Sequence, residues 1–170
     1  MLHHLYSRQI LRCDLETAWN FFSRPENLAV ITPAWMNFRV LTDLHGAAMY
    51  PGQIIEYKVS PVRGVRLHWV TEITQVREKE FFVDEQRFGP YAFWHHKHYF
   101  REVPEGVEMI DEVHYKAPLG WLGRVANALF IRRQLQKIFD YRFAKAEELF
   151  NGNKVLAVFP GKKMTQANHA

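Results

Sequence analysis

The stretch of sequence best suited to chemistry is Phe93–Phe100, which carries three histidines among aromatic residues. If it forms a strand, successive side chains point to opposite faces, and one face collects Trp94, His96, His98 and Phe100. On the strand expected next, Asp111 lies on the apolar face. Pairing the two apolar faces would place Asp111 opposite or diagonal to His98. A buried carboxylate beside an imidazole orients the ring and favours its charged form, which suits acid–base chemistry.

Four interpretations of this cluster are open. A metal site would need three or four ligands, which His96, His98 and Asp111, with Asp84 as a fourth, supply in principle. A catalytic pair would use His98 and Asp111 as acid and base. The polar side chains would otherwise satisfy one another inside the sheet, or anchor a ligand in an apolar cavity. Because two histidines at i and i+2 are a weak metal signal, we expect no metal and no other cofactor.

Other reaction types find little support in the sequence. It contains no glycine-rich phosphate loop, no nucleophile elbow, no cysteine pair and no metalloprotease helix motif. Cys13 is the single cysteine, so no intrachain disulfide is expected, and its position favours a small buried hydrophobic residue over a nucleophile.

The apolar residues form neither a signal peptide nor a membrane span. The first residues lack the long apolar run of a secretory signal, and eighteen consecutive apolar residues occur nowhere. We therefore expect a cytoplasmic protein without an integral membrane segment, whose contact with a membrane, if any, would be peripheral.

The charge distribution argues against a nucleic-acid partner. The formal net charge is +4, from 22 Lys and Arg against 18 Asp and Glu. Three of the basic residues, Lys154, Lys162 and Lys163, lie in 151–170, which has no acidic residue and leaves 19 basic against 18 acidic residues elsewhere. A nearly neutral body lacks the basic stripe that binds a phosphate backbone.

The elements that would position the histidine cluster begin with a strand over Leu5–Cys13. Asp14 is placed to cap a helix whose apolar residues follow a helical period, namely Leu15, Ala18, Trp19 and Phe22. A second short helix is predicted from Pro25 to Pro33, because proline suits the first helical turn and disfavours helix before it.

Six further strands are predicted, separated by turn sequences rich in Pro and Gly. They are Phe38–Thr42, Gln53–Ser60, Val65–Val76, Phe81–Phe88, Phe93–Val103 and Val107–Lys116. The connections are short enough for hairpins, so the fold class expected is α+β with a curved, seven-stranded antiparallel sheet. Alternating apolar and polar residues predict one buried face and one wet face.

A long helix is predicted from Pro118–Gly120 to about Phe150, and its roughly 30 residues would span about 45 Å. That length suffices to cross the sheet and project past it. Its first apolar stripe is Leu122, Val125, Ala126, Leu129 and Phe130, and its second is Leu135, Ile138, Phe139, Arg142, Ala146, Leu149 and Phe150. We expect one domain over 1–150, followed by a loosely ordered tail over 151–170 that holds a short docked segment at Val155–Pro160.

The order of these elements resembles the helix-grip fold of the START-like or SRPBCC superfamily, over about residues 3 to 150. A sequence motif between residues 82 and 115 is more specific for the family than the order of elements. It comprises Phe82, Asp84, Gln86, Gly89–Pro90, Trp94, His96, His98, Phe100, Asp111, Val113 and Tyr115. Together with Pro118–Gly123 and Leu135–Arg142, it is similar to bacterial ligand-binding SRPBCC proteins of the kind labelled cell-division-inhibitor-like. Polyketide cyclases or dehydrases and lipid-transport proteins belong to the same superfamily.

The resemblance implies a cavity between the concave face of the sheet and the long helix, entered near the hairpin ends and the loop Gly46–Gly52. It also makes us point Asp84 and Gln86 inward, since the alternation over Phe81–Phe88 is undecided. It brings no agreed substrate or catalytic residue to this chain.

We therefore predict a non-enzymatic carrier or sensor of a small hydrophobic ligand, such as a lipid, an isoprenoid or a polyketide-like ring. The predicted ligand-binding residues are Trp69, Asp84, Gln86, Trp94, His96, His98, Phe100, Asp111 and Tyr115. One alternative is a cyclase, dehydratase or hydrolase using His98 and Asp111. Another is a protein-interaction module with a filled interior. The sequence does not indicate the oligomeric state.

Overall fold

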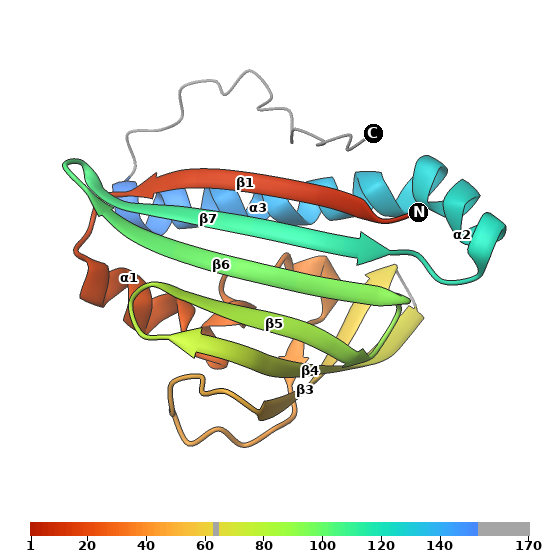
Figure 1. Cartoon of the computed structure of the whole chain (residues 1–170), viewed down its shortest axis with the longest axis horizontal. Helices are drawn as coiled ribbons and strands as arrows, with labels where there is room; N and C mark the ends of the chain where they lie inside the picture. Colours follow the sequence, from red (N-terminus) through yellow and green to blue (C-terminus); the bar gives the residue numbers. More distant parts are fainter. Residues whose placement is uncertain (63–64, 153–170) are drawn as a thin grey trace.

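A computed structural model describes residues 1–62 and 65–152 and shows an α+β architecture built on one sheet (Figure 1). In this part of the chain the sheet has seven antiparallel strands in the order β1-β7-β6-β5-β4-β3-β2. The strands are β1 His3–Leu11, β2 Arg39–Val40, β3 Gln53–Val62, β4 Val65–Arg77, β5 Phe81–Phe88, β6 Phe93–Val103 and β7 Gly106–Lys116. The predicted meander is therefore confirmed, although β2 is shorter than expected.

The segment between β1 and β2 folds as predicted at its start and differs afterwards. Helix α1, Leu15–Phe22, is capped by Asp14, whose carboxylate accepts a hydrogen bond of 2.7 Å from the Thr17 amide. The predicted second helix is a short 3₁₀ turn, η1 Pro25–Ala29, and another, η2 Ala34–Met36, follows Pro33. Pro33, which has no amide hydrogen to donate, separates the two turns, and this explains why no continuous helix forms.

The hairpin of β6 and β7 sets the register of the histidine cluster. His98 stands directly opposite Asp111, which confirms the pairing predicted from the sequence. The tight turn depends on Gly106, whose φ is +135° and whose missing Cβ would lie 2.1 Å from the carbonyl oxygen of Leu11. A side chain at this position would therefore displace β1 from the turn.

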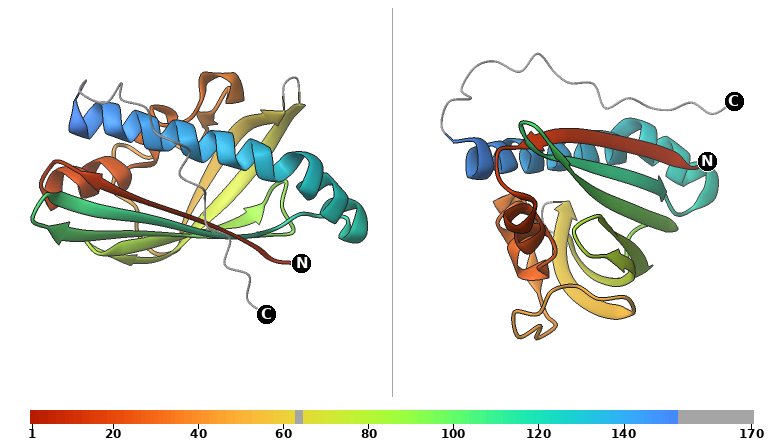
Figure 2. Two further views of the ribbon diagram at one scale, coloured as in Figure 1. Left: turned by 90° about the horizontal axis from the view of Figure 1, so that it is seen from above. Right: turned by 60° about the vertical axis from the view of Figure 1, so that its left-hand side comes forward.

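The C-terminal helical segment runs along the concave side of the sheet (Figure 2). It consists of α2 Gly120–Ala126, a π-helical stretch η3 Asn127–Ile131 and α3 Arg132–Asn151. Leu135, Phe139 and Ala146 of α3 are buried against the sheet and α1, as the second predicted stripe requires. Residues 153–170, which include the predicted segment Val155–Pro160, lie outside the described residues.

The first predicted stripe of this helix does not pack against the sheet. Leu122, Val125, Leu129 and Phe130 are all exposed, with Leu129 at 69% of its full accessible area. Figure 2 shows why, since α2 projects past the end of the strands, where no layer faces it. The residues of the stripe are helical, as predicted, but they face solvent.

None of the helices within 1–62 and 65–152 is both long and apolar enough to cross a membrane.

Candidate functional site

A cavity of about 150 Å³ lies between the concave face of the sheet and α3, with η1 along one side. Its walls are mostly apolar and unusually aromatic, and they include Phe22, Phe38, Tyr57, Trp69, Phe82, Trp94 and Phe139. Polar and charged side chains also line it, and they include Arg24, Asn27, Asp84, His96, His98 and Arg142. An apolar pocket with a few convergent polar groups is the usual form of a small-molecule site.

Two carboxylates and two imidazoles form a closed cycle of contacts at this cavity. Asp84 comes from β5, His96 and His98 from β6, and Asp111 from β7. His96 lies 3.0 Å from Asp111 through Nε2 and 3.3 Å from Asp84 through Nδ1. His98 lies 2.9 Å from Asp84 through Nε2 and 2.8 Å from Asp111 through Nδ1. Each imidazole therefore bridges the two carboxylates.

The four contacts of this His–Asp cycle are not equal. The Nε2 contacts, from His96 to Asp111 and from His98 to Asp84, have the geometry of hydrogen bonds. The Nδ1 atom of His98, in spite of its short distance from Asp111, lies off the direction that a hydrogen bond needs. The cycle is thus held by two hydrogen bonds and two close electrostatic contacts.

Aromatic packing fixes the rings of the cycle from both sides. His98 stacks on Phe82 with centroids 4.1 Å apart and 20° between the planes, and the two imidazole centroids are 3.7 Å apart. The Trp94 indole donates a hydrogen bond of 3.3 Å from Nε1 to Asp84. Neither imidazole can rotate without disturbing this packing.

The four side chains of the cycle differ in their exposure to solvent. The side chains of His96, His98 and Asp111 are only 3–5% exposed, whereas that of Asp84 is 17% exposed. Asp111 does not line the cavity and lies behind the imidazoles. Asp84 is consequently the carboxylate of the cycle that a molecule in the cavity would meet.

The environment shifts the pKa values of the two imidazoles in opposite directions. Burial and the neighbouring charge of His98 lower the pKa of His96 to about 4. Burial also acts to lower the pKa of His98, but its close contacts with the carboxylates of Asp111 and Asp84 outweigh burial and raise that pKa above its usual value. Burial acts to raise the pKa of both carboxyl groups, yet the adjacent imidazoles hold each below its usual value. Of the two imidazoles, His98 is therefore the one that binds a proton more readily, and both carboxyl groups favour their ionised form.

Arg142 on α3 adds a positive charge that the sequence analysis did not assign to the site. Its guanidinium carbon lies 5.6 Å from the centroid of the Phe139 ring, in a cation–π contact. Among the described residues no carboxylate lies within ion-pair distance of it, although its charge helps to lower the pKa of Asp84 and Asp111. A basic residue on the apolar stripe of the long helix was the sequence signal that could have identified it.

The nine residues predicted to bind the ligand do not all face the cavity. Five of them line it, namely Trp69, Asp84, Trp94, His96 and His98. Gln86 instead bonds to the backbone of Tyr91 at 2.7 Å and 3.1 Å, and Phe100 packs in the core beneath α1. Asp111 lies behind the imidazoles, and Tyr115 is fully buried. Tyr57, Tyr91 and Arg142 line the cavity without having been predicted.

The His–Asp cycle can support proton transfer better than metal binding. Asp84, His96 and His98 offer ligand atoms within 4.8 Å of one another. A metal ion there would have to replace contacts that each imidazole already makes with both carboxylates. An imidazole with a raised pKa, held between carboxylates at a cavity wall, can in contrast take up and transfer a proton.

Comparisons with solved structures show that the chain shares its fold with proteins of very different sequence. A protein from Chromobacterium violaceum has a TM-score of 0.65 at 10% identity, with 88% of this chain and 99% of that chain covered. Major latex-like protein 151 from Panax ginseng has a TM-score of 0.63 at 12% identity, with 88% and 97% covered. A protein from Thermus thermophilus has a TM-score of 0.60 at 11% identity, with 85% and 94% covered.

These similarities show the helix-grip fold that the sequence resemblance implied. No protein-family model matches the sequence, and no curated protein matches it either. Folds of this kind serve many functions, so any functional conclusion has to come from the cavity and its residues.

Proposed function

We propose that the protein binds a small, mostly apolar molecule in the cavity between the sheet and α3, without changing it chemically. The observation that carries this proposal is a cavity with aromatic walls, on which the guanidinium of Arg142 has no carboxylate partner among the described residues. A guanidinium without an ion pair is a strong donor for a carboxylate or carbonyl oxygen. The ligand expected is therefore apolar with one such acceptor group.

The cavity volume limits the size of this molecule. A space of about 150 Å³ accommodates a benzene-sized molecule, whereas drug-sized ligands occupy about 300–1,000 Å³. Among the classes predicted from the sequence, a single ring or a short isoprenoid or acyl segment fits without movement of α3. The open space also favours a ligand over the alternative of a filled interaction module.

Calorimetry with matched ligand pairs tests this proposal. Small aromatic and short-chain carboxylic acids should bind more tightly than the corresponding alkanes or arenes that lack the acid. Arg142→Gln should remove most of that difference, while Arg133→Gln, an exposed residue on the same helix, should leave it unchanged. If neither acids nor neutral analogues bind, and organic extracts of fresh protein contain no compound, the binding proposal is wrong.

A second candidate is an enzyme that uses the His–Asp cycle for acid–base catalysis. It is favoured by one observation, the contacts that hold His98 between Asp84 and Asp111 at the cavity wall and raise its pKa. In that case His98→Asn should lower turnover by about a hundredfold or more and leave affinity nearly intact. In a carrier the same change should alter affinity or stability instead.

The remaining sequence predictions stand as part of the proposal. They are a bacterial SRPBCC protein of the kind labelled cell-division-inhibitor-like, a single ligand-binding domain over 1–150 and a cytoplasmic location. Nothing in the cavity discriminates between the labels used within that superfamily.

A further inference from the structure

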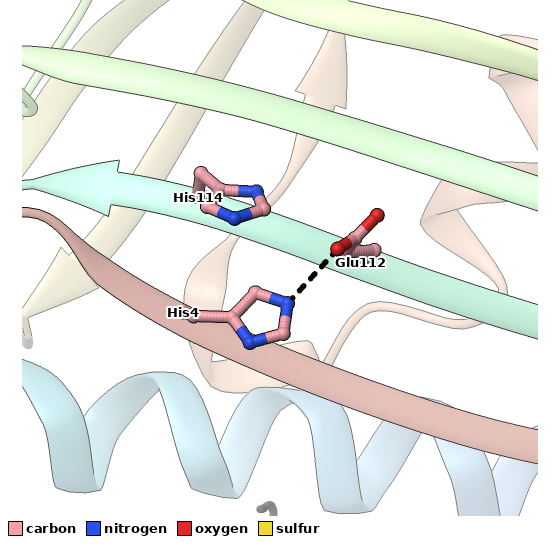
Figure 3. Close-up of side chains that lie close together, drawn as sticks. All are labelled: His4, Glu112 and His114. Atoms are coloured by element: carbon pink, nitrogen blue, oxygen red, sulfur yellow. Dashed lines mark hydrogen bonds and ion pairs between the residues drawn. The ribbon is translucent and has the colours of Figure 1, made fainter. Parts of the chain in front are cut away.

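A second cluster of metal-ligand side chains lies on the outer face of the sheet, away from the cavity. It consists of His4 on β1 together with Glu112 and His114 on β7, and we call it the outer triad (Figure 3). The register of the two strands places His4 directly opposite His114, and Tyr6 opposite Glu112. All three side chains therefore project from the same face.

The geometry of the outer triad is close to that of a metal site. One ligand atom from each residue lies within 4.8 Å of the other two, and His4 Nε2 is 3.2 Å from Glu112 Oε1. In a tetrahedral zinc site with bonds of about 2.0–2.1 Å, ligand atoms are about 3.3 Å apart. Small side-chain rotations would close that difference. The His4 and His114 rings, with centroids 4.6 Å apart, already lie side by side.

The donor set of the outer triad matches one that zinc commonly takes. Two imidazoles and one carboxylate form zinc sites that keep positions open for water. His4 Nε2 and Glu112 Oε1, which lie 3.2 Å apart, would supply two of the ligand atoms.

We infer that His4, Glu112 and His114 bind a divalent transition-metal ion of the zinc type, with solvent completing the coordination. The side chains of His4 and Glu112 are 17% and 27% exposed, so the site is accessible from outside. From the sequence we expected no metal, on the basis of His96, His98, Asp84 and Asp111 alone. This inference is independent of the function proposed for the cavity.

Charged neighbours oppose the metal and provide a specific control. Lys97 Nζ lies 3.4 Å from Glu112 Oε2, and its ammonium group competes with a bound cation for that carboxylate. His95 stands opposite His114 in the register but contacts Glu85 at 2.6 Å, which directs it away from the triad. Removal of the Lys97 charge should therefore strengthen metal binding.

Calorimetric titration of the untagged full chain with zinc tests the inference, with the cobalt absorption spectrum as a second readout. We expect one ion per chain and binding about tenfold or more weaker in His4→Gln, Glu112→Gln and His114→Gln. Lys97→Gln should bind zinc more tightly than wild type. His45→Gln, at an exposed histidine outside the triad, should bind like wild type.

The same titration distinguishes the two clusters. Zinc that binds the outer triad should be unaffected by His96→Asn in folded protein. The inference would be overturned if folded His96→Asn lost zinc binding. It would also be overturned if all three triad variants bound zinc as tightly as wild type, or if wild type bound no zinc. Circular dichroism of each variant establishes that a lost site is not a lost fold.

Discussion

At the scale of single residues, the burial of the Asp111 carboxylate carries a large desolvation free energy. Its carboxylate is only 5% exposed and is compensated by two imidazoles rather than by water. Because a buried charge without its partners is strongly unfavourable, the His–Asp cycle must be retained or lost as a unit. The His–Asp cycle should therefore contribute to folding stability whether or not it takes part in catalysis.

Replacing Asp111 by alanine should destabilise the protein by about 3–5 kcal/mol, because it leaves the buried imidazoles of His96 and His98 without one of their two carboxylate partners. The change should also lower the pKa of His98, which NMR titration of the imidazole measures. Asp43→Ala is the control, since Asp43 is 78% exposed and pairs only with an exposed histidine. Equal unfolding free energies in urea for the two variants would contradict this account.

Trp94 should report whether the cavity is occupied. Its indole lines the cavity, donates to Asp84 and contacts Trp69 edge to face, with the two ring centroids 5.3 Å apart. A bound ligand should change tryptophan emission saturably, and Trp94→Phe should abolish most of the change while binding persists. Trp94→Ala should weaken binding by about 1–3 kcal/mol, measured by calorimetry. An unchanged signal in Trp94→Phe would place the ligand elsewhere.

At the scale of elements, the C-terminal helix contains two apolar stripes of similar sequence but different surroundings. Phe139 on α3 is 5% exposed and contacts the core, whereas Leu129 on η3 is 69% exposed. Phe139→Ala should cost about 3–5 kcal/mol, and Leu129→Ser should change stability by less than about 0.5 kcal/mol. Chemical denaturation of both variants tests the difference. A large cost at Leu129 would mean that this face is covered in solution.

The sequence predicted these elements well where local rules decide them. The bounds of β5 and β6, the cap at Asp14 and the pairing of His98 with Asp111 follow from alternation, capping and turn chemistry. Alternation separates inside from outside, but it does not say whether an inward residue meets a cavity or another side chain. For that reason Phe100 and Tyr115 were expected at the ligand, and Arg142 was not.

Long-range pairing was the other limit of prediction. An amphipathic period does not reveal whether a partner surface exists, so the exposure of Leu122 and Leu129 was missed. The outer triad joins residues more than a hundred positions apart, on β1 and β7. The triad forms only because β1 pairs with β7 in the sheet. The resemblance to the helix-grip fold implied this sheet, but alternation within single strands does not show which outward residues of β1 and β7 meet.

At the scale of the whole molecule, the His–Asp cycle makes folding stability depend on pH in two directions. His96 has a folded pKa of about 4 against an ordinary value of 6.5, so the unfolded chain binds more protons between these values. Stability from His96 is therefore complete above pH 6.5 and is lost as the pH falls toward 4. His98 has a raised pKa, so its contribution is complete below pH 6.5 and is lost as the pH rises through its folded pKa.

The unfolding free energy should therefore pass through a maximum near pH 6.5. Asp84 and Asp111 have lowered pKa values, so protonation of their carboxylates should reduce stability further at still lower pH. His96→Asn should flatten the rise between pH 4 and 6.5, because no group at that position then takes up a proton on unfolding. His98→Asn should remove the decline above pH 6.5 and leave the acidic limb in place. Urea denaturation at closely spaced pH values measures both limbs in the same buffers. A wild-type profile that rises steadily from about pH 5 to 9 would contradict the raised pKa of His98, because a group whose pKa is higher in the folded state makes stability fall as the pH rises through that pKa.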